Sequence, residues 1–432
     1  SSAISKSFFG EIEKSQIGIA KEAKRVVESR VGSYSEFKKY LQDPNGAPDS
    51  KTLLRARNMA AVSFTIQDVR GDVTNAERSF LKINQSATPI HPTELTMIQA
   101  RKKPNALAAR ALLRAGSGHE YWWEFDDNTK KNIVSLARDI YENLFKPLLE
   151  SPIRTLELPA AGQALTPDSL DLVFTLVNHI NGAVDTSTKK KPGNWKHKTK
   201  SGTEEPLEDD KDGSMTLQFL QSVKDATRRV FGSDSGSLAL HTSVYCYGAT
   251  GRFQPTAFFA AIDFVDHLET HRAFDKFTAI RANFENFLIE YRHFINQIVG
   301  SYGSQLKGLP ALTKMYKIIY NNIGTAPNST LVNIIKSDPE LSFITEISED
   351  DRKYGRNFSR ETSNAIFLKQ AIQKALTCGI CGARIHTGTI TLDHKDRKED
   401  GGLGSLKNGQ IAHPYCNHGY KEKMTHAAKS NS

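Results

Sequence analysis

The chain has 432 residues, which exceeds the roughly 250–300 residues at which a single hydrophobic core stops growing. Its 38% apolar and 24% charged residues are typical of a soluble globular protein, and no window approaches the ~20 uninterrupted apolar residues of a membrane span. The 57 Lys and Arg against 48 Asp and Glu leave a net charge of +9, which favours a polyanionic partner. We therefore expect two or three soluble domains and no membrane partner.

The first residues lack both an initiator Met and the basic-then-apolar pattern of a secretory signal, which indicates a processed end or the continuation of a longer chain. Four cysteines are too few for a disulfide-stapled secreted scaffold. Cys246 stands alone, while the other three cluster near the C-terminus, a pattern that suggests metal binding in a reducing compartment. We expect a cytoplasmic protein.

Most of the predicted elements up to residue 184 are helices. Apolar residues at three- and four-residue spacing predict an amphipathic helix over Ile4–Val31, and the alternating run Ala61–Gln67 predicts a strand. Three further stretches have helical composition or a helix-start signal, namely Pro104–Ala115, Asn128–Leu149 and Asp168–Ile180. We predict a mainly α N-terminal domain over 1–184.

A charge-segregated segment follows between Asp185 and Ser214, with lysines in its first half and acidic residues in its second half. Only Trp195 and Leu207 could offset the entropy cost of ordering it. We predict a charged flexible linker or loop over 185–214 that a protease cleaves early. Its basic half is either a contact for DNA phosphates or, as charge runs more often are, a solvated segment.

Helical spacing returns after residue 214 and predicts a mainly α middle domain over 215–375. Phenylalanines recur along Phe258–Leu268 and Phe274–Ile298 at helical spacing, and we interpret them as core side chains, not as a base-stacking platform. A β-rich stretch, Leu238–Tyr247, interrupts the helices. No complete nucleotide-binding fingerprint occurs.

The last segment, 376–432, contains two pairs of metal-ligand residue types, Cys378-Gly-Ile-Cys381 and His413-Pro-Tyr-Cys416. Two residues separate the ligands of each pair, so one tight turn places both within reach of a single ion. Thiolates combined with an imidazole in this arrangement suit a tetrahedral structural Zn²⁺. A Cys-x-x-Cys pair by itself has two alternatives, a redox pair or two ordinary thiols.

Between the two pairs lies a β-rich run, Thr389–His394, that ends in adjacent Asp393 and His394. The order of residue types predicts strand, loop, strand and helix, a ββα unit built on the zinc clip. The segment resembles the HNH endonucleases in their zinc-stapled ββα-metal form, with His413 standing where the family often has Cys. The other residues that carry this resemblance are Gly401, Gly402, Asn408, Asn417 and Lys421.

Phosphodiester hydrolysis explains why these residue types are needed. It requires a base that deprotonates water, for which His394 is the candidate, and cations that neutralise the phosphate. The resemblance implies that Asp393 and Asn417 are oxygen ligands of a catalytic Mg²⁺ or Mn²⁺ ion, which prefers few protein ligands. It also implies that Asn408 orients the His394 ring from across the loop. Because adjacent strand residues point to opposite faces, a bend is needed to aim Asp393 and His394 at one phosphate.

Basic residues flank these positions. We expect them to contact DNA phosphates without sequence preference, the alternative being ordinary solvated side chains. They are Lys395, Arg397, Lys398, Lys407, Lys421 and Lys423.

The stretch Phe80–Leu95 is similar to the Phe-x-x-Ile-Asn, Pro-Ile and Glu-Leu pattern of ParB-like restriction and phage-defence proteins of the GmrSD type, many of which end in an HNH module. The Asp-Gly-Gln-Arg-type motif that carries their nucleotide chemistry is not found upstream. Either it precedes Ser1 or the chain does not hydrolyse nucleotide. Without the resemblance, the stretch is simply a helix ending near Asn84, a turn, and a helix capped by Thr93.

Together these features predict a mainly α multidomain protein with a small C-terminal HNH zinc module. We expect a metal-dependent DNA endonuclease of restriction or anti-phage defence, whose α-helical part recognises DNA or a modification on it. A partner protein or a homo-oligomer is compatible with this interpretation. Two alternatives stay open: a DNA-binding or regulatory protein whose zinc module is only structural, and a homing or toxin-type nuclease.

Overall fold

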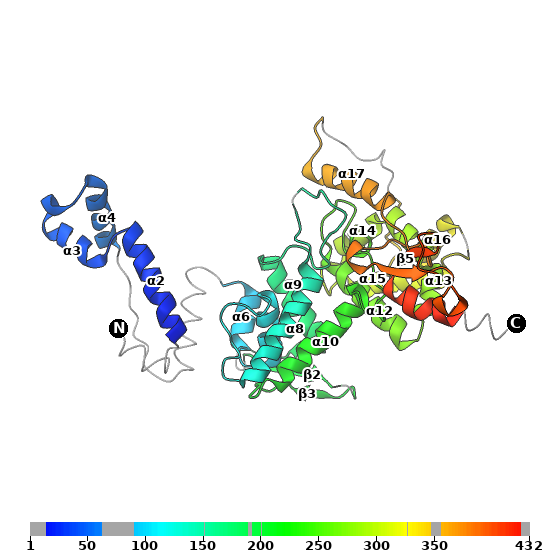
Figure 1. The fold of residues 1–432 in the computed structure, drawn as a ribbon, viewed down its shortest axis with the longest axis horizontal. Helices are drawn as coiled ribbons and strands as arrows, with labels where there is room; N and C mark the ends of the chain where they lie inside the picture. The colour runs from blue at the N-terminus through cyan, green and yellow to red at the C-terminus, as the bar shows by residue number, and fades with distance from the viewer. Residues whose placement is uncertain are drawn as a thin grey trace. The chain divides into compact units, whose positions relative to one another are not determined.

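The computed structural model of the chain describes residues 14–62, 90–150, 152–188, 192–199, 201–325, 327–346 and 356–424. The chain divides into two compact units, Ser1–Ala87 and Thr88–Ser432. The described residues form fifteen α-helices and two small antiparallel sheets, so the predicted mainly α class is confirmed (Figure 1). Within these ranges, no helix is long and apolar enough to cross a membrane.

The described part of the first unit is helical. It contains α2 (Lys14–Arg30), α3 (Tyr34–Gln42), the 3₁₀ turn η1 (Pro44–Gly46) and α4 (Ser50–Ala61). Ser33 caps α3, because its hydroxyl accepts the Glu36 N–H at 3.2 Å while its own N–H donates to the Glu36 carboxylate at 3.1 Å. α3 and α4 pack together and bury Phe37 and Ala56.

Several predicted elements near the N-terminus fall partly outside the described residues. The helix expected over Ile4–Val31 is present from Lys14 onward, and its first ten positions lie outside the described ranges. Of the strand expected over Ala61–Gln67, Ala61 is instead the last residue of α4, and the part from residue 63 is not described. Most of Phe80–Leu95 is likewise outside the described residues, up to the start of α6 (Pro92–Gln99).

The first half of the second unit is a helix cluster around α7 (Pro104–Leu113). α7 packs against α8 (Asp127–Phe145), α9 (Pro167–Ile180) and α10 (Ser214–Phe231), and α6 contacts α9. Eight of the ten residues of α7 are buried. Its many alanines explain this position, since small side chains let neighbouring helices approach the backbone closely.

The second half of the unit is built from aromatic-rich helices. They are α11 (Thr242–Tyr245), α12 (Pro255–Thr270), α13 (Phe274–Glu290), α14 (His293–Tyr302), α15 (Leu309–Asn322), α16 (Asn328–Ser337) and α17 (Arg360–Gln373). At their centre Phe264, Phe284 and Tyr316 are fully buried with ring centroids 5.3–5.9 Å apart. The interpretation of the recurring phenylalanines as core is confirmed.

The charged segment differs from the flexible linker that we expected. Its described residues form a three-stranded antiparallel sheet of β1 (Val184–Asp185), β2 (Trp195–Lys198) and β3 (Glu204–Pro206). The basic and acidic halves face each other across β2 and β3, where Lys196 Nζ lies 3.8 Å from the Glu204 carboxylate. Trp195 and Leu207 are both buried, and the Trp195 ring packs edge-on against Phe174 of α9.

The expected boundaries at residues 184 and 214 do not separate compact units. The two helices on either side of the small sheet, α9 and α10, pack against each other, and α10 also contacts α12. One hydrophobic core therefore runs through both halves of the unit. The division between the two compact units falls at Ala87 instead.

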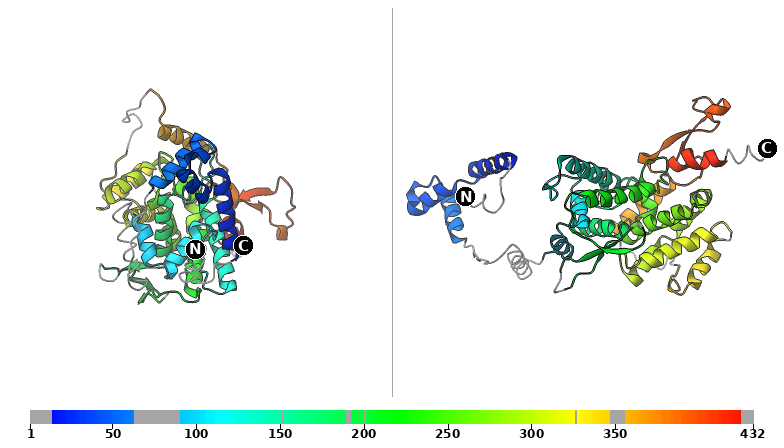
Figure 2. Two further views of the ribbon diagram at one scale, coloured as in Figure 1. Left: turned by 90° about the vertical axis from the view of Figure 1, so that its left-hand side faces the viewer. Right: turned by 90° about the horizontal axis from the view of Figure 1, so that it is seen from below.

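The C-terminal module, defined here as residues 376–424, belongs to the second unit. Its elements are η3 (Thr387–Thr389), β4 (Thr391–His394), η4 (Lys398–Asp400), β5 (Gly409–Ala412) and the π-helical turn η5 (Cys416–Tyr420) within a helix over 414–424. β4 and β5 pair antiparallel with Asp393 opposite Gln410 and His394 opposite Gly409. The predicted order of strand, loop, strand and helix is present, and the long loop between the strands projects away from the helices of the unit (Figure 2).

Replacing Trp195 with Ala should release the small sheet from the helical core. The buried ring holds β2 against α9, and truncating a buried aromatic side chain costs about 3–5 kcal/mol. We expect trypsin to cleave after Lys196 and Lys198 much earlier in the variant than in the parent, as followed by mass spectrometry of limited digests. Glu205→Ala, at an exposed position of β3, should leave the digestion unchanged. Equally fast cleavage in the parent would restore the linker interpretation.

Candidate functional site

Four predicted metal ligands come together in the C-terminal module. Cys378 and Cys381 lie on a tight turn, closed by the Gly382 N–H donating to the Cys378 carbonyl at 2.9 Å. His413 follows β5, and Cys416 begins η5. One ligand atom from each of the four residues lies within 4.8 Å of all the others. The residues predicted to bind one ion therefore form one cluster, buried except for the partly exposed Cys381.

The imidazole of His413 is oriented as a metal ligand requires. Its Nε2–H donates to the carbonyl of Arg384 at 2.9 Å, so the lone pair of Nδ1 points to the sulfurs of Cys381 at 3.4 Å and Cys416 at 3.8 Å. Burial, and then the charge of Arg281, lowers the pKa of His413, which favours the neutral ring. A neutral imidazole with this tautomer is the form that binds Zn²⁺.

The protonation behaviour of the three thiols also suits a bound divalent cation. Hydrogen bonds from Cys381 and Cys416 lower the pKa of Cys378, and the same contacts raise the pKa of the other two. The protein alone thus stabilises one thiolate, whereas a Zn²⁺ ion would let all three ionise. The donor set and its burial fit a structural zinc ion.

A buried ion pair on α13 connects this cluster to the helical core. Arg281 donates to Glu285 at 2.8 Å and to the carbonyls of Leu238 and Ala239 at 2.6 and 3.1 Å. The other oxygen of Glu285 accepts the backbone N–H of Arg384 at 2.9 Å. Because the carbonyl of Arg384 holds the His413 ring, the pair on α13 positions the metal cluster.

A second contact joins the module to the core through Glu157. Its carboxylate lies 2.5 Å from His386 Nε2 and accepts the Thr387 N–H at 3.2 Å. Burial by itself would raise the pKa of Glu157, but the hydrogen bond and charge of His386 outweigh it and lower the pKa to about 2. The ring of His241, fully buried, lies beside His386 with its centroid 6.0 Å away. Neither nitrogen of His241 has a hydrogen-bond partner among the described residues.

Asp393 and His394 have opposite surroundings, as the alternation of a strand predicts. Asp393 is 6% exposed, and its carboxylate accepts from Lys421 Nζ at 2.9 and 3.0 Å and from Gln410 at 2.7 Å. His394 is partly exposed on the other face of β4, and its ring makes no hydrogen bond to any described residue. No bend aims both side chains at one point, and Lys421 also donates to the carbonyl of His394.

The two asparagines brace the module. The Asn417 amide donates to Thr391 Oγ1 at 3.2 Å and to the Leu392 carbonyl at 3.1 Å. Asn408 spans the loop as expected, since its amide donates to the carbonyls of Asp396 and Leu403 at 3.0 and 2.8 Å and its oxygen accepts the Asp396 N–H at 2.7 Å. These contacts do not include the His394 ring, so the structure shows Asn408 bracing the loop and not orienting the imidazole.

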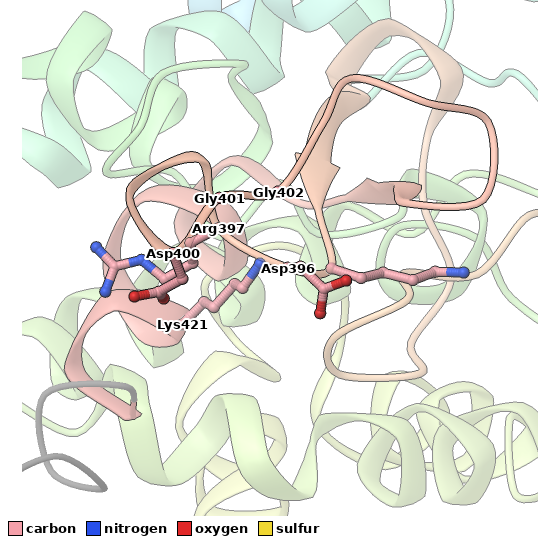
Figure 3. Close-up of a pocket in the computed structure, with 7 residues that line it drawn as sticks. Asp396, Arg397, Asp400, Gly401, Gly402 and Lys421 are labelled. Carbon is pink, nitrogen blue, oxygen red and sulfur yellow. The ribbon is translucent and has the colours of Figure 1, made fainter.

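A basic pocket of about 370 Å³ opens beside the loop. Figure 3 shows Lys421 reaching toward the loop, with Arg397 and Asp400 on one side and Asp396 on the other. The lining residues are Lys395, Asp396, Arg397, Asp400, Gly401, Gly402 and Lys421. Arg397 pairs with Glu422 at 2.8 Å and with Glu399. Three predicted phosphate contacts lie elsewhere: Lys398 and Lys407 are not lining residues, and Lys423 pairs with Asp275 of α13 at 3.0 Å.

The arrangement around Asp393 does not fit a divalent cation as it fits zinc at the cysteines. The ammonium of Lys421 already neutralises the carboxylate, and the Asn417 amide is bound to β4. Sequence reasoning counted Lys421 among the DNA contacts and missed its pairing with Asp393. It also missed Arg281 and Glu285 on α13, and Glu157 and His241 in loops, because nothing in the local sequence signals that these charged or histidine residues are buried or half-buried.

We predict one tightly held Zn²⁺ per chain, measured by elemental analysis of the purified protein. Cys416→Ser should lose most of this zinc and destabilise the module, since metal binding supplies folding energy in a unit this small. Cys246→Ser is the matched control, because this cysteine is buried in the helical core and should leave the zinc content unchanged. Absence of zinc, or a disulfide between Cys378 and Cys381, would contradict the assignment.

We also predict a pH dependence from His241. Burial, and then the charge of His386, lowers its pKa from 6.5 to about 3. Between these values the unfolded chain binds a proton that the folded chain does not, so folding stability falls as pH decreases below about 6.5. His241→Leu should reduce the loss of stability between pH 7.5 and 5.5 in denaturant unfolding with zinc present, whereas exposed His119→Leu should not. An unchanged loss in the His241 variant would show that this ring does not titrate with folding.

No protein-family model, curated protein or solved structure matches this chain. Its function has to be inferred from the geometry of the site.

Proposed function

We propose that the C-terminal module hydrolyses phosphodiester bonds in DNA and that the metal cluster is its structural staple. The position of His394 carries this proposal. The imidazole stands on a short, braced hairpin, without a protein hydrogen bond among the described residues, and the loop that follows it lines a basic pocket. Together with the resemblance to HNH endonucleases, this supports His394 as the base; the pocket, which His394 itself does not line, is the proposed place of the phosphate.

In this proposal each group has one task. The His394 ring accepts the proton of the attacking water, which typically contributes about 10²–10⁴-fold to rate. The pocket supplies Lys395, Arg397 and Lys421 as cations for the phosphate. A bound phosphate would have to draw Lys421 from Asp393, and Arg397 from Glu422 and Glu399. The zinc cluster takes no part in the reaction but fixes the hairpin and the helix relative to each other.

The resemblance also implies a catalytic Mg²⁺ or Mn²⁺ ion on Asp393 and Asn417. In the present arrangement Lys421 holds Asp393, so a divalent ion would have to displace this ammonium. We derive no step from such an ion. Omission of Mg²⁺ and Mn²⁺ from the assay decides whether hydrolysis needs one.

We extend the proposal to restriction or anti-phage defence, in which the helical part recognises DNA or a modification on it. The support is the similarity of Phe80–Leu95 to ParB-like defence proteins and the net charge of +9. Comparing modified and unmodified plasmids in the cleavage assay tests this extension.

A second candidate function is DNA binding by a module whose zinc is purely structural. The observation that favours it is that Asp393, Asn408 and the amide nitrogen of Asn417 all make hydrogen bonds within the module. A module with this function would bind DNA with the salt dependence expected of the proposed nuclease but would not cut the DNA.

His394→Ala should abolish cleavage while leaving zinc content and DNA affinity nearly unchanged. We expect a fall of about 10²–10⁴-fold in the single-turnover rate of plasmid nicking, because the ring acts on water and not in binding. The control is His418→Ala, an exposed histidine of the same module, which should cut at the parental rate. Parental cleavage by the His394 variant would remove the proposed mechanism and leave the DNA-binding alternative.

A further inference from the structure

Arg292 is a buried arginine that lacks a counter-charge. It lies between α13 and α14 and is only 8% exposed. Its guanidinium makes no hydrogen bond or ion pair with any described residue, and its Nη2 atom is closed off from solvent. Glu290, two residues earlier, accepts the Asn328 amide at 2.8 Å, and buried Glu285 is paired with Arg281. The carboxylates nearest to Arg292 in the sequence are therefore used by other residues.

A second arginine without a carboxylate lies where the C-terminal module meets the helices. The side chain of Arg384 donates to the amide oxygen of Asn286 on α13, and it pairs with no acidic side chain in the described ranges. Burial lowers the pKa of Arg292 to about 10, and repulsion by Arg384 acts in the same direction. Because a guanidinium keeps its proton in proteins, the two like charges cost free energy that a bound anion would offset.

A buried hydroxyl offers a further donor beside Arg292. Tyr316 on α15 is fully buried, and its hydroxyl has no hydrogen-bond partner among the residues that the structure describes. This phenol and the Arg292 guanidinium interact electrostatically, so they share one environment. A buried hydroxyl is costly until it meets an acceptor. Guanidinium groups and a hydroxyl together are the donors that suit the oxygens of a phosphate-type anion.

We propose that a small tetrahedral oxyanion, with inorganic phosphate as its type, binds between Arg292 and Arg384, takes the Tyr316 hydroxyl as an additional donor, and clamps the C-terminal module to the helices. Arg292 belongs to the helices and Arg384 to the module, so an anion shared by both joins the two parts through charge-assisted hydrogen bonds. The small exposed fraction of Arg292 favours a free ion over a nucleotide or a DNA backbone.

The clamp has a consequence for the metal cluster. The Arg384 N–H donates to Glu285 at 2.9 Å, and the Arg384 carbonyl accepts from the His413 ring at 2.9 Å. An anion that holds the Arg384 side chain therefore also steadies the peptide that orients a metal ligand. This inference does not depend on the proposed hydrolysis of DNA, and its test contains no DNA.

Equilibrium dialysis of the purified full chain against radiolabelled phosphate, at constant ionic strength in chloride, measures the site directly. We expect saturable binding of one phosphate per chain. Arg292→Met should weaken it tenfold or more, and Arg384→Gln, which keeps the backbone contacts of that residue, should weaken it similarly. Arg138→Met, at an exposed position of α8, should bind like the parent. Sulfate should displace the label, and AMP should displace it only weakly.

Stability supplies an independent readout. Without phosphate, Arg292→Met should unfold at the same denaturant concentration as the parent or a higher one, because it removes an unpaired buried charge and keeps a long side chain. Phosphate should raise the unfolding midpoint of the parent and slow amide hydrogen exchange within residues 376–424 severalfold. It should do neither in the Arg292 variant.

Three results would overturn the anion clamp. The first is a parent chain that shows no saturable phosphate binding, and the second is binding that persists unchanged in Arg292→Met, which would place the phosphate elsewhere, as in the basic pocket. The third is a variant that is much less stable than the parent without phosphate, since Arg292 would then already be satisfied within the fold. Displacement by AMP that is stronger than by phosphate itself would identify a phosphate ester, and not the free ion, as the occupant of the clamp.

Discussion

The buried ion pair between Arg281 and Glu285 is the interaction on which the geometry of the candidate site depends. Both side chains are fully removed from water, a state that is costly unless every donor and acceptor is satisfied. Here Arg281 also donates to two backbone carbonyls, and Glu285 also accepts the N–H of Arg384. Loss of one partner would leave a bare charge in the core, at a cost of about 3–5 kcal/mol. Separating the C-terminal module from α13 would remove the Arg384 N–H from Glu285 and would therefore destabilise this buried pair.

The module needs such support because its own core is very small. Its fully buried apolar side chains are Ala383, Ile385 and Ala412, together with two of the cysteines that form the metal cluster. A core of this size cannot offset the entropy of ordering the segment, and proteins of this kind rely on metal ions or docking. Here the same residues serve both purposes, since the cysteine cluster is the core and the Arg384 peptide links it to the helices.

Asp393 and His394 are neighbours on β4 but lie in different electrostatic surroundings. Asp393 points inward, where Lys421 and Gln410 satisfy its carboxylate, so its charge contributes to the stability of the module. His394 points outward and keeps its ring nitrogens available, beside exposed lysines and leucines. A side chain that acts on an incoming molecule needs this second environment, whereas the first is that of a structural group. Because successive side chains of a strand point to opposite faces, one step along β4 places the two side chains in these two environments.

The sequence by itself determined the features that depend on neighbours along the chain. Helical spacing located the helix that is described from Lys14 onward and the aromatic core. Two-residue spacing located Cys378, Cys381, His413 and Cys416, because one tight turn decides each pair. Only the tertiary structure decided the features that depend on distant partners. Lys196 and Lys198 lie in a strand because the acidic strand β3 pairs with it. Lys421 pairs with Asp393 because the helix folds back on β4, and Arg281 is buried beside Glu285 and the carbonyls of Leu238 and Ala239. No local pattern marks such residues, since a charge with a partner far along the chain looks the same in the sequence as a charge in water.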